Sequence, residues 1–190
     1  SGNVLAGNID EFDGAYMMTR LVDYIVEHLS QQIKAGCDTV QVFDSWASDL
    51  GEEHIIPYCY EPTAQIVERL RALHPDVGII VFPRLIGEEI NNFSKYVNAD
   101  CISLSDDMKT DWILKRMGHQ CLQGGIPPQV LLSERKEEII RGTVPMIRQM
   151  KDCAYVVNLA HGINKETPVE NVRFFIEIVK RNRENITRET

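Results

Sequence analysis

Short apolar runs that end abruptly in polar or turn residues recur along this chain. They cover residues 40–43, 79–82, 101–104, 121–122 and 154–157. Runs of this length, bounded by turn residues, are typical of buried parallel strands. The pattern therefore predicts five parallel strands, and in such sheets the chemistry collects where the strands end at their carboxyl termini.

Between these runs, apolar residues recur at helical spacing. A first helix is predicted on the stripe Met18, Leu21, Val22, Ile25, Leu29 and Ile33, before Gly36. Further helices are predicted over residues 66–73, 88–96 and 112–117. Helices that alternate with strands through short connections are typical of α/β proteins with a parallel sheet.

Two more helices are predicted beyond the fourth strand. Ser133 can cap the first, and Gly142 and Pro145 inside its apolar pattern predict a kink or a break. The last begins at residues 167–170, Thr-Pro-Val-Glu, which combine a capping box with proline at the first helical position. Its buried stripe is predicted to be Val169, Val172, Ile176 and Val179. Residues 182–190 are expected to form a polar, frayed tail.

The length of the chain, 190 residues, fits one domain over residues 1–190 and is less than the roughly 250 residues of a complete eight-stranded barrel. Five parallel strands suit either an open doubly wound sheet or part of a barrel. Periodicity alone does not choose between them. Because the chain begins Ser-Gly without methionine, we expect a processed or cut polypeptide.

Composition excludes several classes of partner. The net charge of −8 argues against nucleic acid or an anionic membrane surface. No apolar run approaches the roughly 20 residues of a membrane-spanning helix, and no signal peptide is expected. The five cysteines form no Cys-x-x-Cys pair, so we expect small buried thiols in a reducing, cytoplasmic compartment.

The polar residues that follow the strands are the candidates for chemistry. His161 is either a proton carrier or substrate ligand near neutral pH, or a turn residue with a satisfied ring. Ser45 lacks the surroundings of a nucleophile elbow and is better read as a hydrogen-bond donor. Asp44 either serves the site or accepts backbone N–H groups at the next helix. Arg84 either binds a carboxylate or phosphate group of a ligand through two hydrogen bonds, or forms a salt bridge with Glu88, Asp106 or Asp107.

Other kinds of site have weak support in the sequence. The pair Gly124-Gly125 lacks the spacing of a dinucleotide-binding loop. The five histidines are scattered, and none is paired at helical spacing as metal ligands would be. The sequence therefore predicts no metal site.

Four motifs resemble the carboxyl-terminal half of uroporphyrinogen decarboxylases. Residues 40–47 read Val-Gln-Val-Phe-Asp-Ser-Trp-Ala, where that family has Phe-(Asp/Glu)-Ser-(Trp/His)-Ala-Gly after a strand. Residues 122–124 read Leu-Gln-Gly, and residues 158–163 read Asn-Leu-Ala-His-Gly-Ile against the family's Asn-Leu-Gly-His-Gly. Residues 167–172 resemble the helix start that follows. The motifs keep the family order over residues 14–181.

The resemblance implies a fold, an activity and a site. The five strands would be the last five of a TIM-like (β/α)₈ barrel, and the enzyme would remove carboxylate from the acetate side chains of uroporphyrinogen, giving coproporphyrinogen without a cofactor. It implies that Ser45 and His161 contact this tetrapyrrole, with His161 catalytic, and that Phe43 packs against it. Asp44 and Arg84 complete the expected substrate-binding set. A homodimer, or self-association of the incomplete barrel, is also expected.

Departures from the family keep two alternatives open. Where the family has Leu-Asp-Trp, this chain has Leu104-Ser105-Asp106, and where the family has Asn-(Leu/Met)-Asp-Pro, it has Gly125-Ile126-Pro127-Pro128. Ser48 and Ala160 each stand where the family motif has a glycine. The family's arginine-rich amino-terminal segment is absent from these residues, so the chain alone is expected to be inactive. One alternative is a non-catalytic tetrapyrrole-binding relative. The other is a corrinoid-linked methyltransferase, whose zinc-binding His-x-Cys pair does not appear in Phe82-Pro83-Arg84-Leu85.

Overall fold

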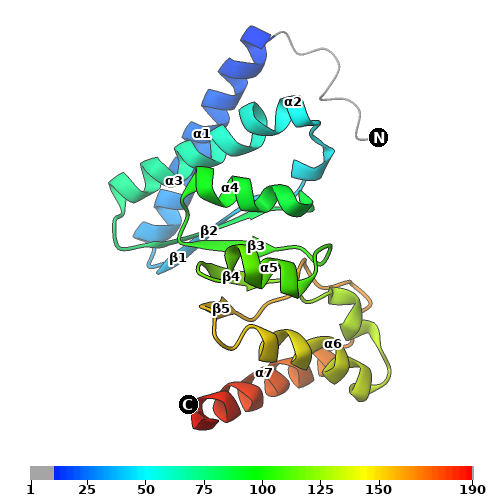
Figure 1. Cartoon of the computed structure of the whole chain (residues 1–190). Helices are drawn as coiled ribbons and strands as arrows, with labels where there is room; N and C mark the ends of the chain where they lie inside the picture. Colours follow the sequence, from blue (N-terminus) through cyan, green and yellow to red (C-terminus); the bar gives the residue numbers. More distant parts are fainter. Residues whose placement is uncertain (1–10, 190) are drawn as a thin grey trace. The chain divides into compact units, whose positions relative to one another are not determined.

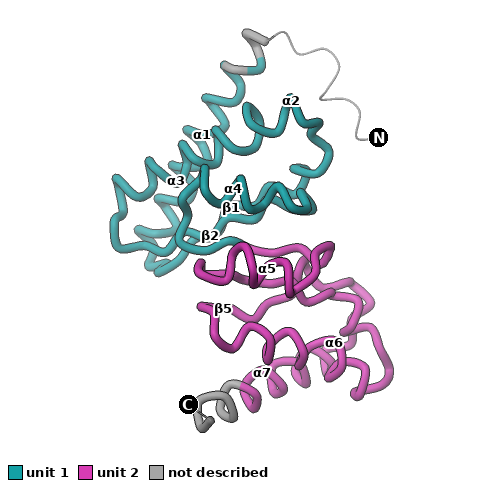
Figure 2. Tube along the Cα trace, viewed as in Figure 1, with its two compact units in different colours: residues 1–102 teal, residues 103–190 magenta. Residues whose placement is uncertain are grey.

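The protein is an α/β protein with five strands, and its computed structural model describes residues 11–189. The strands follow one another in the sheet in chain order, β1-β2-β3-β4-β5 (Figure 1). The β1–β2, β2–β3 and β4–β5 pairs are parallel. The chain divides into two compact units, residues 1–102 and 103–190 (Figure 2), and β3 (Cys101–Leu104) crosses that boundary. The α/β class predicted from the strand pattern is confirmed.

In the first unit, two neighbouring strands run in register and end at the same level. They are β1 (Thr39–Asp44) and β2 (Gly78–Pro83), with Val40 opposite Ile79 and Asp44 opposite Pro83. The longer helices of this unit are α1 (Glu11–Lys34), α3 (Glu61–Leu73) and α4 (Ile90–Val97), the last preceded by the 3₁₀ turn η3 (Gly87–Glu89). Because parallel neighbours end together, the residues after β1 and β2 lie side by side.

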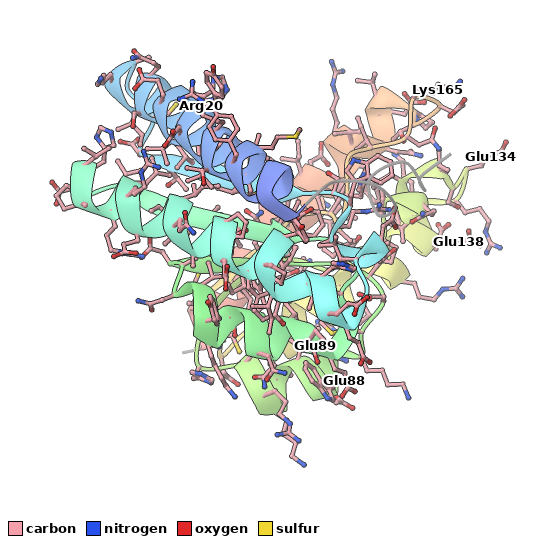
Figure 3. The ribbon with its side chains drawn as sticks, turned by 90° about the horizontal axis from the view of Figure 1, so that it is seen from above. Arg20, Glu88, Glu89, Glu134, Glu138 and Lys165 are labelled. Atoms are coloured by element: carbon pink, nitrogen blue, oxygen red, sulfur yellow. The ribbon has the colours of Figure 1, made fainter. Side chains whose placement is uncertain are left out.

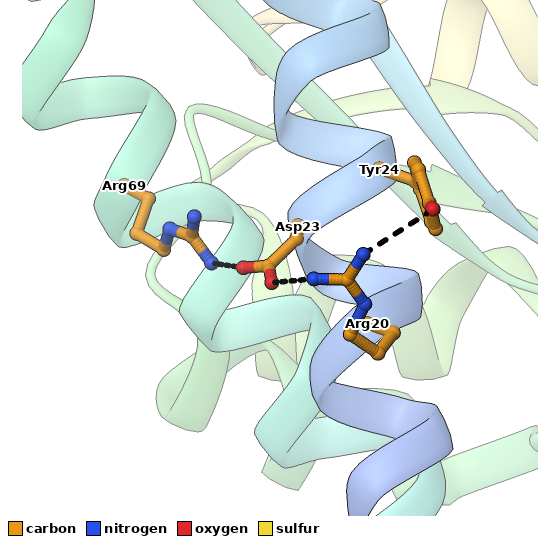
Figure 4. A network of polar contacts seen from close by, with 4 residues as sticks. All are labelled: Arg20, Asp23, Tyr24 and Arg69. Carbon is orange, nitrogen blue, oxygen red and sulfur yellow. Dashed lines mark hydrogen bonds and ion pairs between the residues drawn. The ribbon is translucent and has the colours of Figure 1, made fainter.

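Helices α1 and α3 pack against each other, and a polar network crosses their surface. Asp23 of α1 accepts a hydrogen bond from Arg69 of α3 at 2.8 Å and pairs with Arg20 at 3.8 Å (Figure 4). Val22 and Leu29 of the predicted stripe are buried, whereas Leu21 of that stripe is 49% exposed and Val26, which lies outside it, is buried. The face of α1 that packs inward is therefore slightly shifted from the predicted stripe.

The segment between β1 and α3 is helical, although the sequence pattern predicted no helix between residues 43 and 66. It contains the 3₁₀ turn η1 (Ala47–Asp49), the short helix α2 (Glu52–Ile55) and the π-helical turn η2 (Ile56–Tyr60), which leads directly into α3. A π turn has no periodic pattern of apolar residues by which it could be predicted, and Pro57 within it argues against a helix at this position.

The second unit contains β4, β5 and three helices. Their bounds are β4 (Cys121–Gly124), β5 (Tyr155–Val156), α5 (Thr110–Met117), α6 (Lys136–Gln149) and α7 (Val169–Glu189), with the 3₁₀ turn η4 (Pro128–Leu132) before α6. Leu122 pairs with Tyr155, and a further bridge joins Ile126 to Leu159. The core of this unit consists of Ile126, Leu131, Ile139, Phe175 and Ile178.

Helix α6 corrects two expectations. The expectation at Pro145 was a kink or a break, and because the helix is continuous through that residue the break is excluded. Pro145 is exposed, and solvent can therefore satisfy the carbonyl group that the proline leaves without a donor. Ser133 precedes the helix instead of capping it directly: its hydroxyl accepts from the N–H of Arg135 at 3.1 Å and donates to Glu138 at 2.7 Å.

Helix α7 is rotated from its predicted stripe. Val169 and Ile176 are 64% and 46% exposed, whereas Phe175 and Ile178 are buried. The buried side chain of Asn171 sets this rotation, because its amide donates to the carbonyl groups of Leu131 at 2.8 Å and Ser133 at 2.9 Å. The helix begins one residue after Pro168 and its backbone is helical to Glu189. The predicted capping box is not formed, since the Thr167 hydroxyl has no hydrogen-bond partner.

Replacing Asn171 with alanine is expected to lower the free energy of unfolding by about 2 kcal/mol, because two carbonyl groups would lose their donor. Urea unfolding measures the change. The neighbouring Glu170→Ala is the control, since Glu170 is exposed and its loss should change stability by no more than about 0.5 kcal/mol. Equal unfolding midpoints for the two variants would contradict this account of how α7 is oriented.

Candidate functional site

The carboxyl ends of β1 and β2 form one edge of the first unit. The N–H of Arg84 donates to the carbonyl oxygen of Asp44 at 3.0 Å, which ties the two strand ends together. Ser45 and Arg84, the first residues after the two strands, are therefore neighbours. Leu85 follows with a φ of 57°, a left-handed conformation that costs a non-glycine residue about 1 kcal/mol. Such conformations occur at functional sites.

An exposed aromatic surface adjoins this edge. Phe43 is 64% exposed and contacts Phe82 edge-to-face, with ring centroids 6.2 Å apart and planes at 82°. Trp46 is 72% exposed. Because Phe82 is buried, it supports Phe43 from below and leaves the outer face of that ring open. Such a ring can pack against a flat apolar ligand.

Asp44 is half-buried, and the N–H of Trp46 lies 3.4 Å from its Oδ1. Burial raises the pKa of Asp44, whereas the neighbouring thiol of Cys59 and the N–H of Trp46 act to lower it. The backbone contact expected of Asp44 is therefore present, although it leaves acceptor capacity on the carboxylate for a ligand.

Ser45 and Arg84 have side chains that are free to bind. Among the side chains that the structure describes, Arg84 forms no ion pair, so Glu88 of the same unit does not neutralise it; the other expected partners, Asp106 and Asp107, belong to the second unit. Within the same described set, the hydroxyl of Ser45 has no hydrogen-bonded base. The geometry therefore favours a hydrogen-bond donor over a nucleophile at Ser45.

Two residues of η2 that sequence reasoning overlooked support this edge. Cys59 is 1% exposed and contacts Asp44. Tyr60, 4% exposed, donates to the carboxylate of Glu89 at 3.0 Å and packs edge-to-face on Phe93. Glu89 lies beside Glu88 in η3 (Figure 3). The sequence offered no signal for these contacts, because they depend on the π turn.

In the second unit, His161 follows the extended pairing of β4 and β5. Ala160 is buried and its N–H donates to the carbonyl oxygen of Ile126 at 2.7 Å, while the next side chain, that of His161, is exposed. In the part of the chain that the structure describes, the His161 ring has no hydrogen-bond partner. Both interpretations of His161, a proton carrier or substrate ligand and a turn residue with a satisfied ring, therefore stay open, because solvent can reach the exposed ring.

Gly124 at the end of β4 is required by packing. Its φ is 82°, and a Cβ atom would lie 3.0 Å from the carbonyl oxygen of Leu104 and 3.2 Å from that of Leu159. The hydroxyl of Tyr155 donates to the carbonyl oxygen of Gly124 at 2.6 Å, and burial raises the pKa of that tyrosine. The Leu-Gln-Gly motif thus has a structural reason for its glycine.

The structure thus brings Phe43, Asp44, Ser45 and Arg84 together in one unit, and His161 belongs to the other. Within the described residues, no group of three or more His, Cys, Asp or Glu side chains is arranged to hold a metal ion. None of the helices that the structure describes combines the length and apolar composition needed to span a bilayer.

The fold and the motifs define the protein as a TIM-barrel-type α/β protein with a candidate site at its strand ends. Its residues 11–182 match the family model for uroporphyrinogen decarboxylase (URO-D), so the chain belongs to the uroporphyrinogen decarboxylase family.

Relatives named uroporphyrinogen decarboxylase agree with this assignment. The chain is 31% identical over 166 residues to the protein from Cereibacter sphaeroides (strain ATCC 17025 / ATH 2.4.3), which covers 86% of this chain and 48% of the relative. It is 34% identical over 160 residues to the protein from Orientia tsutsugamushi (strain Boryong), and this match covers 84% of this chain and 47% of the relative. The relative from Paracoccus denitrificans (strain Pd 1222) is 32% identical over 167 residues, and the match covers 87% of this chain and 48% of that relative. The chain therefore spans about half the length of these relatives.

Thiol exposure gives a direct check on the environment around Asp44. Iodoacetamide at pH 8 is expected to alkylate Cys37, which is exposed, on the order of 100-fold faster than Cys59, because Cys59 is buried and burial raises its thiol pKa. Mass spectrometry of peptides at successive times measures both rates. Labelling in urea is the control and should equalise them. Rapid alkylation of Cys59 in the folded chain would contradict its place against Asp44.

Proposed function

We propose that this chain supplies the carboxyl-terminal half of a uroporphyrinogen decarboxylase, which removes carboxylate from the four acetate side chains of uroporphyrinogen. Family membership supports the reaction. The observation that carries the site is the unpaired guanidinium of Arg84 beside Ser45 and next to the exposed ring of Phe43. These groups suit a ligand that is apolar in its ring and anionic at its rim.

The proposed chemistry needs no external electron acceptor. Protonation of a pyrrole carbon makes the ring cationic, so that the ring accepts the electron pair released when the bond to the carboxylate breaks and CO₂ leaves. A proton then adds to the remaining methylene carbon, giving a methyl group, and the ring carbon releases the proton that it first accepted, which restores the neutral pyrrole. The protein must position the substrate, bind its carboxylates and move protons.

Each residue has a role that follows from its surroundings. The Phe43 ring packs against the tetrapyrrole, and Arg84 binds a carboxylate through two N–H groups. Ser45 donates a hydrogen bond, and Asp44 accepts one from a ring N–H. His161 is the proposed catalytic residue, since an imidazole carries protons near neutral pH and its exposed ring is unpaired in the described structure. The activity is thus proposed to need residues beyond this chain.

Site-resolved NMR tests the proposal without requiring tight binding. Uroporphyrin, the stable oxidised form with eight carboxylates, is titrated into the 190-residue chain, and coproporphyrin, with four, serves as the comparison. We expect uroporphyrin to shift the signals of Ser45, the Arg84 side chain and His161 more strongly. Shifts confined to basic residues elsewhere, such as Lys115 and Arg116 of α5, would show non-specific attraction and overturn the proposal.

We also propose that the reaction belongs to porphyrin and heme biosynthesis, and we expect the protein to be a cytoplasmic homodimer. Family membership supports the pathway. Sedimentation equilibrium tests the oligomeric state, with a mass of twice 21.7 kDa expected for the dimer.

A further inference from the structure

Helix α1 has two apolar faces, and one of them is open to solvent. The covered face carries buried residues spaced by four and three positions: Val22, Val26 and Leu29. Met17, Leu21 and Tyr24 repeat this spacing and are 59%, 49% and 65% exposed. We call these three residues the outer stripe. Each lies five positions before a buried residue, which at 3.6 residues per turn places the two stripes roughly 140° apart around the helix. The outer stripe therefore faces away from the packing of α1 against α3 and β1.

The charged residue nearest the outer stripe already has partners. Arg20 donates a hydrogen bond to the hydroxyl of Tyr24 at 3.3 Å, and its guanidinium lies 5.3 Å from the centroid of the same ring. It also pairs with Asp23 at 3.8 Å (Figure 4). Contiguous exposed apolar side chains with a polar rim of this kind mark surfaces that bind another protein surface. The outer stripe thus suits an apolar partner.

The strand that follows α1 indicates where such a partner would attach. Strand β1 is the terminal strand of the sheet order, and among the described strands it pairs with β2 alone. A helix between two parallel strands packs over both of them, so α1 has the position of a helix that joins β1 to an earlier strand. That strand would pair with the outer edge of β1. In a barrel the helices form an outer ring, so the helix before that strand would pack on the outer stripe.

We propose that the outer stripe and the outer edge of β1 form the docking surface for the amino-terminal half of a uroporphyrinogen decarboxylase-type barrel. The comparison with relatives supports this occupant, because the chain matches the carboxyl-terminal half of the Cereibacter sphaeroides protein and covers 48% of it. The inference deepens the proposed function by naming where the remaining half attaches, and its test does not depend on catalysis.

Methionine oxidation measures whether the outer stripe is covered. Met17 is exposed, so hydrogen peroxide should oxidise it rapidly in the 190-residue chain, whereas the buried Met117 and Met150 should react slowly. In a hybrid in which the amino-terminal half of the Cereibacter sphaeroides relative precedes this chain, Met17 should react on the order of 10-fold more slowly. Tandem mass spectrometry distinguishes Met17 from Met18 and follows all four residues.

A charge placed on the outer stripe tests the same surface by stability. Leu21→Lys should lower the Tm of the hybrid by about 5 °C or more, because the charge would be buried without a partner. Leu73→Lys is the matched control, since Leu73 is 61% exposed at the end of α3 in the same unit. In the 190-residue chain alone, neither change should shift the Tm by more than about 2 °C.

Co-expression with an unlinked partner covers the case in which the hybrid does not fold. The 190-residue chain should be recovered with a tagged amino-terminal half of the relative, and Leu21→Lys should reduce that recovery on the order of 10-fold, with little effect of Leu73→Lys. Failure to recover the wild-type chain with that half, when the hybrid also fails to fold, would overturn the proposal.

The outcomes separate this proposal from its rivals. Equal oxidation of Met17 in the chain and in a folded hybrid would overturn it. Slow oxidation of Met17 in the 190-residue chain would also overturn it, because the outer stripe would then be covered by a second copy or by the chain itself. A hybrid that protects Met17 but leaves uroporphyrinogen unchanged would overturn the proposed function and support the docking surface.

Discussion

Replacing Arg84 with glutamine is expected to weaken the binding of uroporphyrin to the chain about 10- to 100-fold, since a charge-assisted hydrogen bond contributes about 1.5–3 kcal/mol. The glutamine keeps a hydrogen-bond donor of similar reach and removes the charge. The guanidinium of Arg84 forms no ion pair among the side chains that the structure describes, so its loss leaves no protein carboxylate unpaired. The effect should therefore appear in binding and not in stability.

Arg69→Gln is the matched control, because it makes the same change of charge in the first unit. Arg69 lies on α3 and pairs with Asp23 at 2.8 Å, away from the strand ends. Its replacement should change affinity by no more than about twofold, as expected for an exposed ion pair. Isothermal titration calorimetry or the NMR titration measures both variants. A similar loss of affinity in the two would mean that net charge, and not a specific contact, attracts the ligand.

Replacing Gly124 with alanine is expected to lower the free energy of unfolding by about 3 kcal/mol, combining left-handed strain with a steric clash. The φ of Gly124 is 82°, and the added Cβ would lie 3.0 Å from the carbonyl oxygen of Leu104. That atom belongs to the backbone of β3 and cannot move as a side chain would. The hydrogen bond from Tyr155 to the Gly124 carbonyl, 2.6 Å long, would also be displaced.

Gly162→Ala provides the comparison within the same unit. A Cβ at Gly162 would meet no atom within 4 Å, so this change should alter stability by no more than about 0.5 kcal/mol. Urea unfolding followed by circular dichroism measures both variants. If Gly124→Ala were as stable as Gly162→Ala, the tight packing assigned to the end of β4 would be wrong.

Much of the strand framework was predictable from the sequence. Residues 101–104 were predicted as a strand and form β3 with the same bounds. The prediction succeeded because strands of a parallel sheet are buried on both faces and therefore appear as short, continuous apolar runs. The edge that joins Asp44, Ser45 and Arg84 was predictable for the same reason, since parallel neighbours end together. The sequence could not indicate that Ser45 and Arg84 are unpaired, which depends on where all other side chains lie.

The errors arose where a polar residue or an irregular turn decides the packing. Asn171 reads as a surface residue, yet its hydrogen bonds to Leu131 and Ser133 orient α7 and bury Phe175 in place of the predicted Ile176. The contact between Cys59 and Asp44 arises from a π turn that periodicity cannot reveal. Long-range partners of this kind lie outside any local pattern.

The most direct test of the central claim is catalysis by a hybrid in which this chain replaces the matched half of the Cereibacter sphaeroides relative. Uroporphyrinogen is supplied under anaerobic conditions, and the products are separated by their number of carboxyl groups. The account predicts products with seven to four carboxylates, and a loss of that activity in the His161→Ala hybrid. A folded hybrid that binds uroporphyrin but leaves all eight carboxylates of uroporphyrinogen in place would contradict it.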